Sequence, residues 1–104
     1  MIKWYENLYM DKKVSKKPNK YIRGIEDGKL TLGLYCITLA SNENNLFDII
    51  EANELFFRHY RENILCIVGL AKGKDSALQM VQDLVMEMYH HTGEFKVKEY
   101  FIFP

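Results

Sequence analysis

Two polar loops, residues 41–45 and 72–76, hold the side chains best suited to bind a ligand. Hydroxyl and amide groups follow one apolar run, and lysines flank a glycine after another. If both runs are parallel strands, the loops open at one edge of the sheet, where α/β proteins bind ligands. We therefore predict a site for a small anionic or polar metabolite, built by Ser41, Asn42, Asn45, Lys72, Gly73, Lys74 and Ser76.

The second loop invites comparison with a phosphate-binding P-loop. A P-loop reads G-x-x-x-x-G-K-Ser/Thr, because its N–H groups wrap the phosphates and its hydroxyl reaches magnesium. Here Gly69 and Gly73 stand one residue too close, and Asp75 separates Lys74 from Ser76. The pattern therefore argues against nucleotide hydrolysis. Two readings stay open: an anion held by the lysines and the following helix N-terminus, or an ordinary strand-to-helix turn.

A lysine-rich segment, residues 12–23, is a weaker candidate for contact with nucleic acid. The chain as a whole has a formal net charge of zero. Lysine contacts to phosphate are independent of base sequence and weaken steeply with salt. A solvated loop has the same composition, so this alternative stays open beside the first. The residues concerned are Lys12, Lys13, Lys16, Lys17, Lys20 and Arg23.

No group of residues forms a recognisable catalytic or metal-binding motif. Cys36 and Cys66 each lie in an apolar run, as buried structural thiols do. His90 and His91 are adjacent and would point about 100° apart on a helix, while His59 has no carboxylate at a ligand spacing. We therefore predict no catalytic residue, no metal and no cofactor, and the sequence favours a protein that is not an enzyme.

The aromatic content points to an interface. The chain has seven Tyr, six Phe and one Trp, more than a small core readily buries, and aromatic residues are enriched at the centres of interfaces. Tyr100, Phe101 and Phe103 lie on a predicted edge strand and would form the contact with another copy or another protein. The alternative is that Phe101 and Phe103 simply cover the core.

The elements that must position these groups alternate between strand and helix. Apolar, β-favouring runs predict three strands, and apolar residues at helical spacing predict three helices, the last with Ser76 and Gln79 as a capping box and Gly93 as its stop. Residues 1–10 would add one helical face or a short docking arm. The strands are expected over 32–40, 64–71 and 94–103, and the helices over 18–27, 46–61 and 76–92.

This order predicts an α/β fold, because strands alternating with helices are joined by right-handed crossovers into a parallel sheet. We expect a small two- or three-layer sandwich with a three-stranded, mainly parallel sheet (β-α-β-α-β) and an extra N-terminal helix. Residues 1–104 would form a single domain. Within it, residues 1–30 form a basic, aromatic-rich arm and helix, and residues 31–104 form the core.

The expected location is the cytoplasm, without membrane contact. The N-terminus lacks the apolar stretch of a signal peptide, and the longest apolar run, residues 64–71, is far shorter than a membrane-spanning helix requires. Scarce cysteines outside any paired motif suit a reducing compartment.

The stretches 3–9, 33–55 and 64–89 resemble a small uncharacterised family of bacterial cytosolic proteins of about this length. The resemblance implies a shared domain and brings no activity, cofactor or catalytic residue with it. The sequence therefore predicts a non-enzymatic protein-interaction or regulatory module, which associates as a homo-oligomer or binds another protein. The alternatives are a metabolite binder at the two loops and, more weakly, nucleic-acid contact through residues 12–23.

Overall fold

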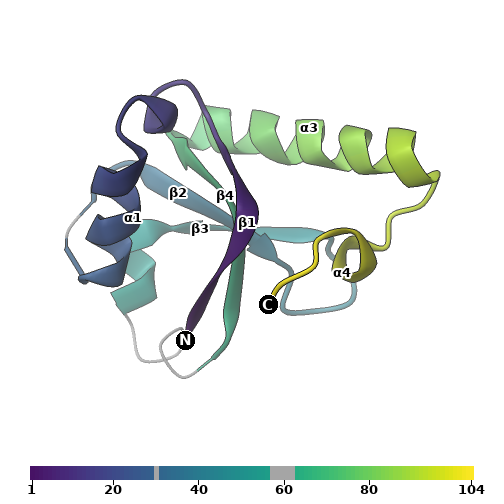
Figure 1. Ribbon diagram of the computed structural model, residues 1–104, viewed down its shortest axis with the longest axis horizontal. Helices are drawn as coiled ribbons and strands as arrows, with labels where there is room; N and C mark the ends of the chain where they lie inside the picture. The colour runs from purple at the N-terminus through teal and green to yellow at the C-terminus, as the bar shows by residue number, and fades with distance from the viewer. Residues whose placement is uncertain (30, 57–62) are drawn as a thin grey trace.

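Four strands form one mixed sheet in the computed structural model, which describes residues 1–29, 31–56 and 63–104 (Figure 1). They are β1 (Ile2–Met10), β2 (Leu34–Leu39), β3 (Phe47–Glu51) and β4 (Leu65–Lys72). Their order across the sheet is β1-β4-β2-β3. β1 is parallel to β4, whereas β2 is antiparallel to both β4 and β3. The predicted three-stranded, mainly parallel β-α-β-α-β sheet is therefore wrong.

The first departure is a hairpin where a helix was expected. A helix was expected over residues 46–61, but β3 and then the 3-10 turn η2 (Ala52–Phe56) occupy residues 47–56, and residues 57–62 lie outside the described residues. The side-chain oxygen of Asn42 accepts the N–H groups of Asn44 and Asn45, at 2.9 and 3.1 Å, and thereby closes a tight turn. A turn this short joins antiparallel strands, because a parallel pair needs a long crossover.

The second departure is at the N-terminus, where residues 1–10 form β1 instead of a helical face or a separate arm. Trp4 and Leu8 pack on one face of the sheet, whereas Tyr5 and Tyr9 pack on the other. These side chains therefore follow the two-residue period of a strand. The spacing of residues 4, 5 and 8 also fits a helix, and the pairing of β1 with β4, more than 50 residues later, decides between the two.

Two helices cover opposite faces of the sheet and give three layers (Figure 1). Helix α1 (Pro18–Glu26) begins with proline in its first turn, as expected, and packs with Cys36, Ile67 and Leu70 on one face. Helix α3 (Lys74–Thr92) covers the other face, against Ile37 and Val68. Because both faces are covered, β2 and β4 are continuous apolar runs.

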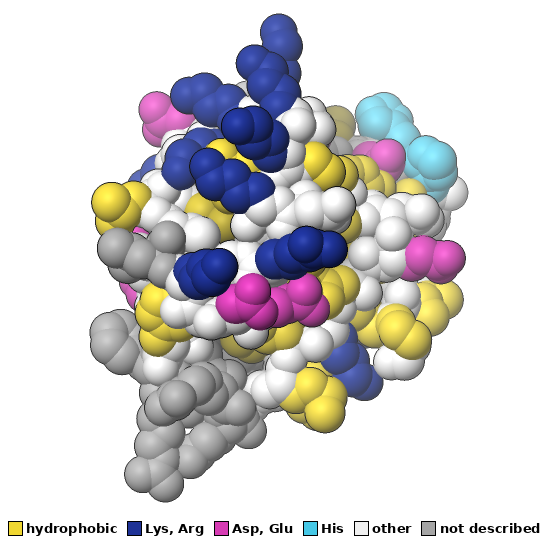
Figure 2. Space-filling model, turned by 60° about the vertical axis from the view of Figure 1, so that its left-hand side comes forward, with side chains coloured by type: hydrophobic (Ala, Val, Ile, Leu, Met, Phe, Trp, Pro, Cys, Tyr) yellow, Lys and Arg dark blue, Asp and Glu magenta, His cyan; other side chains and the backbone are white. Residues whose placement is uncertain are grey.

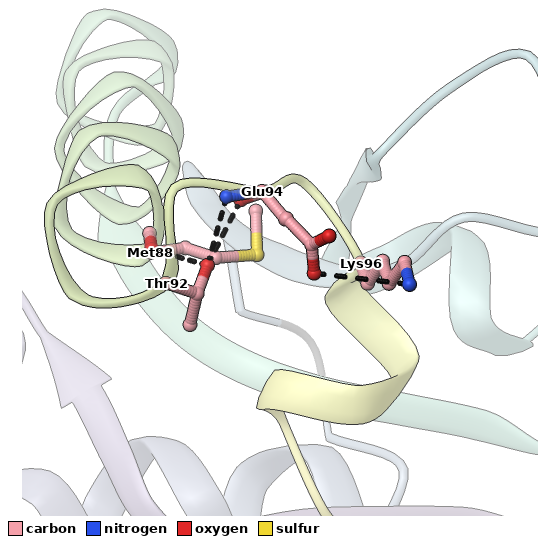
Figure 3. Close-up of polar contacts among 4 residues, drawn as sticks. All are labelled: Met88, Thr92, Glu94 and Lys96. Carbon is pink, nitrogen blue, oxygen red and sulfur yellow. Dashed lines mark hydrogen bonds and ion pairs between the residues drawn. The ribbon is translucent and has the colours of Figure 1, made fainter.

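The third departure is at the C-terminus, where the strand expected over residues 94–103 is absent. Gly93 adopts a φ of 70° and donates its N–H to the Tyr89 carbonyl at 2.7 Å, so it ends α3 as expected. The Thr92 hydroxyl lies 2.9 Å from the Met88 carbonyl oxygen and accepts the Glu94 N–H (Figure 3). The chain then turns back into the short helix α4 (Val97–Tyr100) instead of extending along the sheet.

Phe101 explains why this segment folds inward. Its side chain is 1% exposed, and its ring meets four other aromatic rings at centroid distances of 4.9 to 6.3 Å. Burial of such a large apolar ring lowers the free energy of the fold more than its placement on an exposed edge strand would. The four partners are Tyr5, Tyr9, Phe47 and Tyr100.

None of the helices in the described part of the chain is both long and apolar enough to span a membrane.

Candidate anion-binding surface

The carboxyl ends of β1 and β4 lie side by side, because these two strands are parallel and neighbouring. Tyr9 is opposite Gly69, and Met10 is opposite Leu70. Asp11, which follows β1, and Lys72, the last residue of β4, therefore meet at one edge of the sheet. The start of α3 lies at the same edge. This is the position at which α/β sheets bind ligands.

The Asp11 carboxylate ties this edge together. One of its oxygens accepts the Val14 N–H at 2.9 Å. The other accepts the Lys72 N–H at 2.8 Å and the Ser76 hydroxyl at 2.7 Å. The carboxylate therefore holds the end of β4, the start of α3 and the 3-10 turn η1 (Val14–Lys16) in fixed relation.

The ionisation of Asp11 reflects these contacts. Partial burial raises its pKa, but three hydrogen bonds and the charge of Lys13 lower it by more. The result is a pKa below the ordinary value of 3.8, and the side chain is a carboxylate at neutral pH.

The beginning of α3 differs from the prediction in one respect. Ser76 does not form a capping box with Gln79, since Gly73 is the N-cap residue and no side chain caps the helix. The Ser76 hydroxyl donates to Asp11 instead. The Gly73 N–H donates to the Gly33 carbonyl at 2.7 Å and so anchors the loop to the chain that precedes β2.

Lys72 lies beside Gly73 and Lys74 as predicted, but its ammonium group contacts other parts of the chain. Its ammonium group donates to the Leu32 carbonyl and lies 5.6 Å from the centre of the Tyr21 ring. Both contacts place its charge on the side of α1. Of the two lysines in the loop, Lys74 remains exposed at the start of α3.

A depression of about 560 Å³ lies at this edge, with lysines from two distant parts of the chain around it. Lys12, Lys13 and Lys16 come from the segment after β1, Lys72 is the last residue of β4, and Lys74 comes from the start of α3. Asp75 adds one exposed carboxylate. Lysine and arginine side chains gather over the upper part of the face shown in Figure 2, and few acidic side chains lie among them.

The positive charge continues from the depression along α1. Lys20 and Arg23 are three residues apart on this helix and are exposed, and Lys17 immediately precedes it. We call the exposed cationic side chains of both segments the lysine-rich surface. It consists of Lys12, Lys13, Lys16, Lys17, Lys20, Arg23 and Lys74.

The other predicted loop lies at the opposite end of the sheet. Tyr35, near the start of β2, is opposite Ala71, near the end of β4, because the strands are antiparallel. Residues 41–45 follow the end of β2 and are therefore a full strand length away from residues 72–76. The prediction that Ser41, Asn42 and Asn45 share a site with Lys72, Gly73, Lys74 and Ser76 is wrong for this reason.

The 41–45 loop borders a separate, larger cavity of about 850 Å³. There, Asp48 accepts both the N–H and the hydroxyl of Ser41, at 3.0 and 3.2 Å. Thr38 also lines the cavity, and its buried hydroxyl has no hydrogen-bond partner among the described residues. The remaining polar side chains at the cavity include Lys98 and Asn63.

The predicted interface residues do not form an exposed edge. Phe101 belongs to the core, which agrees with the alternative interpretation of that residue. Tyr100 and Phe103 are partly buried, and their rings pack against Phe101 and Tyr5, respectively. The edge strand expected to carry Tyr100, Phe101 and Phe103 is therefore absent, whereas an interface formed by these residues stays a prediction.

The cysteines, Tyr9 and the potential metal ligands among the described residues are not arranged for catalysis or metal binding. Both cysteines are free, and burial raises the pKa of Cys36 to about 12, which disfavours the thiolate. Burial, followed by a hydrogen bond to the Glu87 carboxylate, strongly raises the pKa of Tyr9. Within residues 1–29, 31–56 and 63–104, no cluster of three or more His, Cys, Asp or Glu could hold a metal, and His59 lies outside these ranges.

Sequence reasoning missed Asp11, which organises the site. The apolar pairs at residues 4–5 and 8–9 gave only an ambiguous signal, because they fit a helix as well as a strand that is covered on both faces and leaves Asp11 at its end. Nothing in the sequence indicated that Lys74 lies near residues 12–16, because this proximity depends on the pairing of β1 with β4.

No protein-family model matches the sequence, and no curated protein or solved structure matches it either. The resemblance to a family of small bacterial proteins therefore stays a prediction.

Proposed function

We propose that this protein is a non-enzymatic interaction module that binds a phosphate-bearing partner on the lysine-rich surface. The observation that carries the proposal is the convergence of Lys12, Lys13 and Lys16 with Lys74 around one depression at the start of α3. Phosphate is the anion that such a surface favours, because clustered ammonium groups and the free N–H groups of a helix N-terminus both attract it.

The arrangement supports surface attraction instead of an enclosed phosphate site. In a P-loop, backbone N–H groups and a hydroxyl surround the phosphates. Here the Lys72 N–H and the Ser76 hydroxyl are already bound to Asp11. A ligand must therefore bind through exposed ammonium groups, which favours an extended anion with several phosphates over a single small one.

The number of lysine–phosphate contacts determines how strongly the affinity should depend on salt. If Lys12, Lys13, Lys16 and Lys74 each contact one phosphate of a single strand, the slope of log affinity against log salt is about −2.8. Raising the salt from about 50 to about 200 mM then weakens binding about 50-fold. Each lysine removed should reduce the slope by about 0.7.

The experiment is a fluorescence-anisotropy titration of a labelled single-stranded oligonucleotide of about 20 residues, with inorganic phosphate and a nucleoside triphosphate as competitors. The Lys12→Ala/Lys16→Ala variant should weaken binding at least tenfold. The control, Lys96→Ala/Lys98→Ala, removes the same charge from exposed lysines outside the surface. It should change binding less than threefold.

Lys74→Ala tests whether the two segments act together. We expect it to weaken binding about as much as removal of either lysine alone, although it lies some 60 residues further along the chain. The proposal would be refuted if Lys12→Ala/Lys16→Ala and Lys96→Ala/Lys98→Ala weakened binding equally. It would also be refuted if the unchanged chain did not bind the oligonucleotide at low salt. Tight competition by the triphosphate alone would assign the surface to a small ligand.

The cytoplasm is the proposed location. Two free thiols, Cys36 and Cys66, support a reducing compartment.

A further inference from the structure

The larger cavity, at the end of the sheet opposite the lysine-rich surface, contains a buried polar group that the fold leaves unpaired. Thr38 lines this cavity of about 850 Å³ and is 1% exposed, and its hydroxyl has no hydrogen-bond partner among the described residues. Such groups are rare in native proteins, because a buried hydroxyl without a partner raises the free energy of the fold. The cavity therefore holds a hydrogen-bonding group that a ligand can satisfy.

An acidic side chain lies beside Thr38. Thr38 and Asp48 are directly opposite each other on the antiparallel strands β2 and β3, so both side chains point to the same face, with their Cβ atoms about 4.5–5.5 Å apart. The Asp48 Oδ2 atom accepts two hydrogen bonds from Ser41, whereas its Oδ1 atom accepts none from the described residues. An ammonium group has three donors and can therefore bind Oδ1 of Asp48 and the Thr38 hydroxyl together.

A basic side chain lines the same cavity. Lys98, on α4, is exposed. Lys98 and Asp48 both belong to the described part of the chain, yet they form no ion pair with each other. Opposite charges that line one cavity without meeting leave room for a molecule that carries both charges.

Apolar side chains form the rest of the wall. One of them, Ile64, is 63% exposed, although it is large and apolar. A few polar groups set among apolar walls are typical of small-molecule sites, and the volume lies in their usual range of about 300–1,000 Å³. The apolar lining residues are Leu39, Ala40, Ile49, Ile50, Ile64 and Leu65.

We propose that this cavity binds a small zwitterion with an apolar side chain, the class to which the free apolar α-amino acids belong. Asp48 and Thr38 hold its ammonium group, and Lys98 attracts its carboxylate. The apolar part of the ligand contacts residues such as Ile50 and Leu65. The cavity is separate from the lysine-rich surface, because the antiparallel pairing of β2 with β4 places the two at opposite ends of the sheet.

Thr38→Val separates binding from folding, because it removes the hydroxyl and keeps the shape of the side chain. Without ligand, the variant should unfold at the same temperature as the unchanged chain or a higher one, since an unpaired buried hydroxyl is gone. Its affinity for the ligand should fall about tenfold, because a hydrogen bond to a charged group is lost. Thr31→Val is the matched control, since it removes another unpartnered buried hydroxyl that lies outside the cavity. It should leave the affinity unchanged.

NMR titration of the ¹⁵N-labelled chain with L-leucine and L-phenylalanine measures the affinity. The amide signals of residues 38–41 and 63–66 should shift and approach saturation at or below about 10 mM amino acid. Two analogues test the charges: 3-methylbutylamine lacks the carboxylate of leucine, and 4-methylpentanoate lacks its ammonium group. Each should bind several times more weakly than leucine. Lys98→Met should reduce the affinity for leucine to that for the amine, whereas Lys96→Met, at an exposed lysine outside the cavity, should not.

The inference would be overturned if neither amino acid shifted these signals, or if Thr38→Val bound leucine as tightly as the unchanged chain. Equal affinities for leucine and 3-methylbutylamine would overturn the role given to Lys98. Oligonucleotide binding by Thr38→Val should be unchanged, because Thr38 lies outside the lysine-rich surface. This inference and the proposed function therefore fail separately.

Discussion

Replacing Asp11 with Ala should destabilise the fold, because the carboxylate accepts three hydrogen bonds that a methyl group cannot accept. The donors are the Val14 N–H, the Lys72 N–H and the Ser76 hydroxyl. A buried hydrogen bond to a charged group contributes about 1.5–3 kcal/mol, and partial exposure reduces this to about 1 kcal/mol for each bond here. We therefore expect a loss of about 3 kcal/mol in the free energy of unfolding.

Urea denaturation at neutral pH measures this loss. Ser76→Ala, which removes one donor, should cost about 1 kcal/mol, and adding it to Asp11→Ala should cost little more, because the bond is already gone. Ser15→Ala is the control, since its exposed hydroxyl donates only to the Lys12 carbonyl. A free energy of unfolding for Asp11→Ala within about 0.5 kcal/mol of that of the unchanged chain would refute the role given to this carboxylate.

The same carboxylate sets a pH dependence. Because its pKa in the folded protein lies below the ordinary value of 3.8, its contribution is fully present above pH 3.8. The contribution disappears as the pH falls through the lower pKa of the folded protein. The stability difference between the unchanged chain and Asp11→Ala should therefore shrink as the pH falls below 3.8. A difference that stays constant into acid would contradict the assignment.

Two further variants test the packing. Phe101→Ala should cost about 3 kcal/mol by emptying the centre of the aromatic cluster, whereas Ile102→Ala, whose side chain is 72% exposed, should cost little. Gly69→Ala should cost about 1–2 kcal/mol, because the added Cβ would lie 2.6 Å from the Met80 sulfur and 3.4 Å from the Tyr9 Cβ. In a Met80→Ala background the same change should cost less. Urea denaturation measures both, and equal losses for Phe101→Ala and Ile102→Ala would contradict the first.

Local patterns were enough to predict the two long helices and two central strands. Pro18 marks the start of α1, and Gly93 the end of α3, because each residue has a backbone preference that acts within one turn. The apolar runs around Cys36 and Val68 became β2 and β4, since a strand buried on both faces shows no polar alternation.

The same local signals were ambiguous where packing decides. Ile49 and Ile50 fit either a helix or a strand, and the turn at Asn42 settles the choice by returning the chain antiparallel to β2. Lys96 and Lys98 alternate with apolar residues as in an edge strand, but the Phe101 ring enters the core and the segment forms α4 instead.

The sequence by itself determined that this is a small α/β domain with a basic N-terminal segment and no recognisable catalytic motif. Strand direction and strand order were decided only by tertiary structure, because hydrogen bonds between strands join residues far apart in the chain. The pairing of β1 with β4 brings Asp11 to Ser76 and Lys12 to Lys74. The antiparallel pairing of β2 with β4 sends the loop at Ser41 to the opposite end of the sheet.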